Sequence, residues 1–127
     1  MATIYSPDSP NSPEIDKWEI QLRKGCLELA ILASLWPKKL YGLEIIRRLE
    51  TDSDLSLSAG TVYPLLARLK SDHLLESSWV EGEAAHPRKY YELTAAGRKR
   101  AIEMARMWTR FSASLGNLLS PLLKEGQ

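Results

Sequence analysis

The sequence has little cysteine, little histidine and almost no excess of charge of either sign, and each shortage excludes a class of protein or site. Its 127 residues include one cysteine, Cys26, so no disulfide can form within the chain. One cysteine and two histidines are a poor supply for a structural zinc site, which needs about four ligands. Lys and Arg number 17 against 16 Asp and Glu, and the net charge of +1 excludes a uniformly basic coating protein and an acidic disordered tail. A single thiol is typical of the reducing cytosol, so we expect a cytoplasmic protein.

Long apolar runs and catalytic motifs are missing as well. The longest apolar stretch, Leu29–Trp36, is interrupted by Ser34 and is much shorter than the roughly 20 residues that span a bilayer. No basic region followed by an apolar one begins the chain, so we expect neither a secretory signal nor a membrane partner. The motifs G-x-S-x-G and H-E-x-x-H and a glycine-rich phosphate loop are absent, so we expect no enzymatic activity and no cofactor. What is present, 44% hydrophobic and 26% charged residues, is an ordinary globular mixture that suits one compact domain and one additional helix.

Residues 1–16 are predicted to form a flexible N-terminal arm. Pro7, Pro10 and Pro13 recur among Ser, Asp and Asn, without Lys or Arg, a pattern that favours extended, solvated backbone. The arm is either a solvated tail or a segment that packs on a partner subunit.

A first helix is predicted to begin near Asp16, a plausible N-cap, and to end at Pro37. Its apolar residues recur every three or four positions, which is the period of one helix face. This stripe consists of Ile15, Trp18, Leu22, Cys26, Leu29 and Ala33. Cys26 is therefore interpreted as a small buried hydrophobe rather than as a nucleophile.

Two further helices are predicted over residues 41–50 and 58–72. The first buries Leu43, Ile46 and Leu49 or their near neighbours, and the second has a core face at Val62, Leu65, Leu66 and Leu69. Pro64 leaves open which residue is the N-cap of the helix over residues 58–72. If Ser58 is the N-cap, Pro64 removes the hydrogen bond to the Gly60 carbonyl, whereas if Thr61 is the N-cap, Pro64 lies in the first turn at no cost.

A two-stranded hairpin and a long helix are predicted to complete the chain. The strands, residues 75–81 and 88–93, are rich in aromatic and β-branched residues and flank a tip over residues 82–87. Thr94 is the expected N-cap of a helix over residues 95–123, about 43 Å long at ~1.5 Å per residue, which exceeds the roughly 30 Å of a small domain. Gly116 weakens its second half, and Pro121 is a point where it could end early.

The long helix has a strict heptad seam, in which apolar residues step by three and four. Because an overhanging apolar seam must be covered, we expect a homodimer, with the stripe of the first helix joining the interface. The expected interface consists of Ile15, Trp18, Leu22, Met104, Trp108, Phe111, Leu115 and Leu118.

The order helix, helix, helix, hairpin, long helix predicts a fold that is mainly α with a small β-hairpin. It is a winged helix-turn-helix domain over residues 17–94, preceded by the arm and followed by a C-terminal dimerisation helix and tail over residues 95–127. The third helix would then enter the major groove of DNA with its small and hydroxyl side chains, and basic residues would frame it. The candidate DNA contacts are Lys38, Lys39, Ser58, Gly60, Thr61, Tyr63, Arg68, Lys70, Arg88 and Lys89. The competing interpretation is a solvated helix face with ordinary charges.

With these residues in hand, the chain resembles the PadR family of bacterial transcriptional regulators over about residues 20–112. The similarity lies in LRKGCLELAILASL, LYGLEIIRRLE, LSLSAGTVYPLLARLKSDHLLES and PRKYYELTAAGRKR, in that order. The family pattern has an acidic residue followed by glycine where this chain has Asp72 and His73, a departure that bears on the turn into the first strand. The short C-terminus resembles the smaller branch of the family.

The resemblance implies a homodimeric repressor, without enzymatic activity, on a two-fold operator. It implies Tyr41 as a further DNA neighbour, beside Ser58, Gly60, Thr61, Tyr63 and Lys89. It also suggests a flat aromatic effector held between paired tryptophans of the long helices, with Trp108 at the matching place. Met104 and Met107 could adapt the walls of such a slot, because methionine fits irregular shapes. The alternative for Trp108 is plain dimer core, and the alternative for the whole protein is a winged-helix protein-interaction module without DNA binding.

Overall fold

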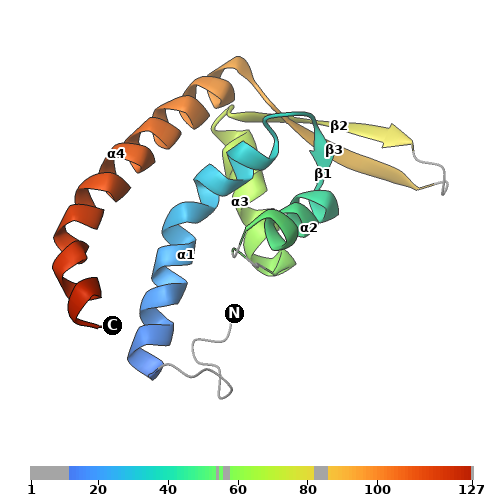
Figure 1. Ribbon diagram of the computed structural model, residues 1–127. Helices are drawn as coiled ribbons and strands as arrows, with labels where there is room; N and C mark the ends of the chain where they lie inside the picture. The colour runs from blue at the N-terminus through green and yellow to red at the C-terminus, as the bar shows by residue number, and fades with distance from the viewer. Residues whose placement is uncertain (1–11, 54, 56–57, 82–85, 127) are drawn as a thin grey trace.

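The computed structural model describes residues 12–53, 55, 58–81 and 86–126, and the fold is mainly helical, as predicted (Figure 1). Seven elements follow one another along the chain. They are α1 (Pro13–Ser34), β1 (Leu40–Tyr41), α2 (Gly42–Asp52), α3 (Ala59–Ser71), β2 (Leu75–Glu81), β3 (Pro87–Leu93) and α4 (Ala95–Glu125). The sheet has three antiparallel strands in the order β1-β3-β2 rather than the two predicted, because the two-residue β1 adds to the outside of β3.

Helix α1 begins earlier than predicted. Ser12, not Asp16, is the N-cap, and its Oγ accepts a hydrogen bond from the Ile15 amide at 3.3 Å. Pro13 occupies the first helical position, where its missing N–H costs nothing and its fixed φ favours the helix. Residues 13–16 therefore belong to α1 rather than to the arm, and residues 1–11 of the arm lie outside the described residues.

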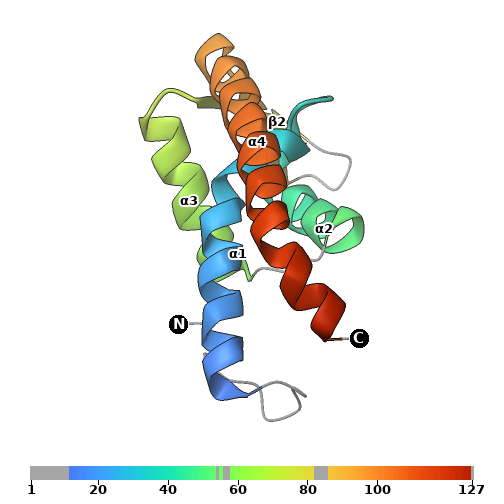
Figure 2. The ribbon, with the colours of Figure 1, turned by 60° about the vertical axis from the view of Figure 1, so that its left-hand side comes forward.

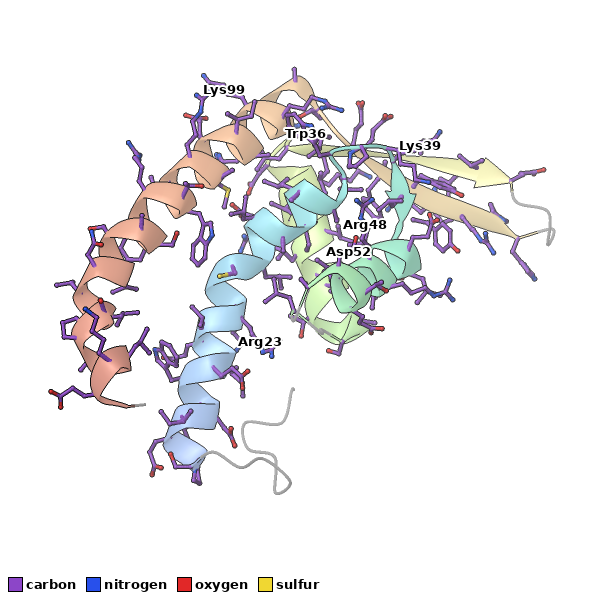
Figure 3. The ribbon with its side chains drawn as sticks, in the orientation of Figure 1. Arg23, Trp36, Lys39, Arg48, Asp52 and Lys99 are labelled. Atoms are coloured by element: carbon purple, nitrogen blue, oxygen red, sulfur yellow. The ribbon has the colours of Figure 1, made fainter. Side chains whose placement is uncertain are left out.

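The structure decides the open question about α3. The Ser58 carbonyl accepts hydrogen bonds from the amides of Thr61 and Val62 at 3.0 and 3.1 Å, so Ser58 is the N-cap and Pro64 lies inside the helix. In α2, Leu43 is exposed, and the buried residues are its near neighbours Ile45 and Ile46 together with Leu49. The exposed side of α2 has an Arg48–Asp52 ion pair of 3.0 Å (Figure 3).

The apolar core lies where α1, α2 and α3 meet one face of the sheet. Its residues are Leu27, Ile31, Leu32, Leu35, Leu40, Ile45, Ile46, Leu49, Val62, Leu66, Leu69, Leu74, Leu75, Tyr91, Leu93 and Ala101. Among the described residues, Ala101 is the α4 member of this buried cluster, and Met104 of α4, partly buried, packs against it. Helix α4 passes through Gly116 and Pro121 without ending, and its distal part extends beyond the core on the same end of the molecule as the start of α1 (Figures 1 and 2).

The end of α3 and the start of α4 are joined by a compact set of backbone contacts. His73 has a φ of 62°, the left-handed conformation that glycine favours, and the Leu74 amide donates back to the Leu69 carbonyl at 3.0 Å. Thr94 is the N-cap of α4, as predicted: its Oγ1 donates to the His73 carbonyl at 2.7 Å and accepts from the Gly97 amide at 2.9 Å. The C-terminal end of α3 and the start of α4 are therefore fixed to each other.

Candidate nucleic-acid interface

The N-terminus of α3 is open to solvent. Ser58, Gly60 and Tyr63 are exposed, and the Oγ atoms of Ser58 and Thr61 lie 3.3 Å apart. A Cβ built on Gly60 would have Ser58 Oγ, at 3.7 Å, as its one neighbour among the described residues. Free amides of a helix N-terminus favour a phosphate, and small hydroxylated side chains allow close approach to base edges.

Tyr63 packs against the start of α2. Its ring lies so close to Gly42 that a Cβ there would overlap it, so the glycine at the start of α2 makes room for the phenol. Burial raises the pKa of the Tyr91 phenol, the nearby Tyr63 raises it further, and Tyr91 is therefore neutral at physiological pH. Tyr63 is consequently a fixed, half-exposed ring beside the open end of α3.

The hairpin has two different faces because side chains alternate along each strand. The inner face packs on the core through Leu75, Leu93 and Tyr91, and beyond the core it continues to Trp79 and Lys89, which are paired in register. The Lys89 Nζ lies 6.0 Å from the centre of the Trp79 ring and 5.8 Å from that of the Tyr91 ring. Both distances are within the range of cation–π attraction.

The outer face has a second cation–π cluster. Tyr41 and Tyr90, paired between β1 and β3, meet edge to face at 5.5 Å, with Arg88 4.6 Å from the Tyr41 ring. Lys39 lies 5.6 Å from the Tyr90 ring, at the side of the sheet where β1 begins (Figure 3). The neighbours Arg88 and Lys89 therefore point to opposite faces, and the basic residues predicted as one group are divided between two surfaces.

Three other predicted DNA contacts lie apart from these clusters. The Arg68 Nη2 donates to Glu28 Oε1 of α1 at 2.8 Å, and Arg100 of α4 lies 3.8 Å from the second Glu28 oxygen. This ion pair directs Arg68 toward α1 rather than toward the open end of α3. Lys70 is exposed in the last turn of α3, and Lys38 is exposed between α1 and β1.

A row of large apolar side chains lies exposed along α1 and the distal part of α4. Among the predicted interface residues, Phe111 is 62% exposed, Leu118 74% and Trp108 47%, whereas Met104 is half-buried. The other exposed members are Ile15, Trp18, Leu22, Met107, Leu115, Leu119, Leu122 and Leu123. Patches of this kind on a small domain are typical of an interface with another chain.

A cavity of about 480 Å³ lies between α1 and α4, and a second of about 400 Å³ lies along α1 between Leu55 and Trp108. Leu22, Cys26, Leu29 and Trp108 line both of them. Cys26 is thus half-buried on a groove rather than enclosed in the core. The predicted ligand residues Met104, Met107 and Trp108 line the larger cavity together with Phe111. At the other cavity, Arg23 and Glu19 form an ion pair of 3.0 Å (Figure 3).

Several residues of these surfaces were not among those predicted from the sequence. Trp79, 67% exposed, could have been found from strand alternation, because it falls opposite Lys89 once the hairpin register is known. Trp36 and Arg98 had no sequence signal: the guanidinium carbon lies 4.6 Å from the Trp36 ring, and Nη2 donates to the Trp36 carbonyl at 3.2 Å. Their contact attaches the start of α4 to the end of α1, where Figure 3 labels Trp36.

The described part of the chain lacks two other features, a metal-binding cluster and a membrane-spanning helix. It has no group of three or more His, Cys, Asp or Glu side chains that could hold a metal ion. None of its helices is both long enough and apolar enough to cross a bilayer.

The comparisons with known proteins agree with this architecture. Residues 31–103 match the family described as transcriptional regulator PadR-like. A PadR-like transcription factor from Bacteroides fragilis is 38% identical, over 80% of this chain and 97% of that one, with a TM-score of 0.67. A PadR family transcriptional regulator from Eggerthella lenta is 33% identical, over 84% and 92%, with a TM-score of 0.75. A PadR-like transcriptional regulator from Bacillus cereus is 32% identical, over 78% and 96%, with a TM-score of 0.71. No curated protein sequence matches the chain.

Proposed function

Because the chain belongs to the PadR-like family of transcriptional regulators, we propose that it is a homodimeric, cytoplasmic repressor without enzymatic activity that binds a near-palindromic operator. The observation that carries the proposal is the open N-terminus of α3, with Ser58, Gly60, Thr61 and Tyr63 beside a hairpin that has two cation–aromatic clusters. Such an end suits the major groove, and the cations suit the flanking phosphates.

The dimer half of the proposal is supported by the exposed apolar row on α1 and α4. A two-fold interface would cover the same row on both subunits. Two recognition helices would then enter successive major grooves about 34 Å apart, which requires an operator with two-fold symmetry. Footprinting on the DNA that flanks the protein's own gene tests binding and locates such a site in one experiment.

Substitutions at the DNA-facing residues give the first quantitative prediction. Lys89→Ala is expected to weaken binding to all sequences and to reduce the slope of log affinity against log salt by about 1, because one phosphate contact is lost. Thr61→Ala and Tyr63→Ala should each weaken operator binding by about 1 kcal/mol or more, or about fivefold, without changing the fold or the oligomeric state. Fluorescence anisotropy at several salt concentrations measures these effects.

The same experiment separates the two function classes. A protein-interaction module with this fold has no reason to bind duplex DNA with a steep salt dependence. Unchanged affinity in all three variants would exclude this surface, and absence of salt-sensitive binding in the wild type would favour the protein-interaction module.

The effector half of the proposal concerns the groove beside Trp108. A flat aromatic molecule would fit between apolar walls and adaptable methionines, and it would contact the helices that set the spacing of the two wings. It would relieve repression only by binding the DNA-incompetent spacing more tightly, and a difference of about 1.4 kcal/mol would change operator affinity tenfold.

Titration with flat aromatic dyes tests this groove. We expect strong quenching of tryptophan fluorescence that is lost in Trp108→Ala while the dimer persists. Quenching that survives the substitution would assign the dye to another site, because Trp18, Trp36 and Trp79 also contribute to the fluorescence. Absence of quenching by every dye would mean that the two Trp108 rings pack directly in the seam.

A further inference from the structure

The inner face of the wing, which is the hairpin of β2 and β3, has a lysine close to two aromatic rings. The Lys89 ammonium lies 5.8 Å from the centre of the Tyr91 ring on β3, and Lys89 is opposite Trp79 on β2. These three residues form one strip along the inner face of β2 and β3, from the buried part of the sheet outward. The outer cluster, with Arg88 and Tyr41, is on the other side of the sheet.

Trp79 does not belong to the core formed by the described residues, although it is a large apolar side chain. It is 67% exposed and lies beyond the buried part of the sheet, which ends at Tyr91. It is also separate from the α1–α4 row that we assign to the dimer. The contact that the structure gives it is the Lys89 ammonium at 6.0 Å.

We propose that Trp79 is a positioning residue for DNA binding, which holds the Lys89 ammonium over the inner face of the wing so that it meets a backbone phosphate. A free lysine side chain loses rotamer entropy when it is fixed, and a lysine already confined beside two rings loses less of it on binding. Tyr91 is the fixed, buried ring of the pair and Trp79 is the exposed one. The proposal rests on the DNA-binding function proposed above.

The test measures the affinity of the full-length chain for a fluorescein-labelled duplex of arbitrary sequence at low salt, where phosphate contacts dominate binding. An exposed cation–π contact contributes about 0.5–1 kcal/mol, so Trp79→Leu should weaken binding about two- to fivefold. Trp79→Phe, which keeps a ring opposite Lys89, should recover most of the affinity. Ser78→Leu places the same new side chain on the neighbouring, outward-facing position and controls for the addition of an exposed leucine to β2.

A double-mutant cycle distinguishes positioning from a direct DNA contact. If Trp79 acts through Lys89, Trp79→Leu should have no further effect in the Lys89→Ala background. An equal loss in both backgrounds would overturn the proposal, because Trp79 would then contact DNA independently. Failure of Trp79→Phe to restore binding would overturn it as well, since the aromatic ring would not be the property that matters.

The wild-type salt slope separates this inference from the function on which it rests. If the wild type binds with a steep slope and Trp79→Leu binds equally well, the positioning role alone is wrong. If the wild type shows no salt-sensitive binding to duplex DNA, the proposed function is wrong and the role of Trp79 is wrong with it.

Discussion

Gly97→Ala is expected to destabilise the protein by about 3 kcal/mol, although alanine is the better helix former. A Cβ at this position would overlap the Leu74 carbonyl oxygen and lie 3.3 Å from Leu93 Cδ2. The Leu74 carbonyl cannot move away freely, because it accepts the Thr94 amide at 3.1 Å in the junction between α3 and α4. Helix α4 would have to retreat from the sheet, and the hydrogen bonds of the Thr94 cap would weaken.

Gly116→Ala is the matched control, because it makes the same substitution in the same helix. No described heavy atom outside the helix's own backbone lies within 4 Å of a Cβ at Gly116, so the variant should gain the ordinary helix propensity of about 1 kcal/mol. Thermal unfolding followed by circular dichroism measures both variants, and for Gly97→Ala we expect a fall in Tm of roughly 10 °C. A Gly97→Ala variant as stable as the wild type would contradict the close approach of α4 to Leu74.

The three strands and the helices around them show how much of the fold can be predicted from the sequence. Helix periodicity, the Thr94 cap and the two long strands have local signals, and the structure confirms the elements predicted from them. Strand β1 has two residues and forms by pairing Leu40 and Tyr41 with residues about fifty positions later. A pairing so distant and so short leaves no local pattern, so the third strand could not be predicted.

The turn at His73 is a second feature that the local sequence does not predict. Glycine is the residue expected at a left-handed helix end, yet His73 adopts that conformation with a φ of 62°. The surrounding hydrogen bonds, from Leu74 to Leu69 and from Thr94 to the His73 carbonyl, hold the backbone there despite the side chain. Tertiary contacts determine this turn, and they are not visible in the local sequence.

For the candidate DNA surface as well, the sequence predicted one part of the arrangement, and only the three-dimensional structure shows the other. Small and hydroxylated residues before a helical stripe predicted the open end of α3, and the structure exposes Ser58, Gly60 and Tyr63 there. Charge alone did not predict where each cation points. Arg68 pairs with Glu28, forty residues away, and Arg88 and Lys89 separate to two faces once strand alternation is applied.

Trp108→Glu is expected to abolish the proposed dimer. Trp108 is 47% exposed in one chain and lies in the middle of the heptad seam, between Met104 and Phe111. A second copy would bury it, and a carboxylate there would be desolvated without a partner, which is strongly destabilising for an interface. Because Ala101 and Met104, the α4 residues that pack on the described core, both precede Trp108, the winged helix-turn-helix part should keep its fold in the monomer.

Light scattering at several protein concentrations checks this result, and circular dichroism reports whether the monomer stays folded. Ala113→Glu is the matched control, since Ala113 is an exposed residue of the same helix on the side opposite the seam, and we expect this variant to remain dimeric. Operator affinity should fall steeply in Trp108→Glu alone, because a monomer presents one recognition helix where a two-fold site requires two. A Trp108→Glu protein that remains a stable dimer would mean that α4 is not the seam, and the exposed apolar row would then need another partner.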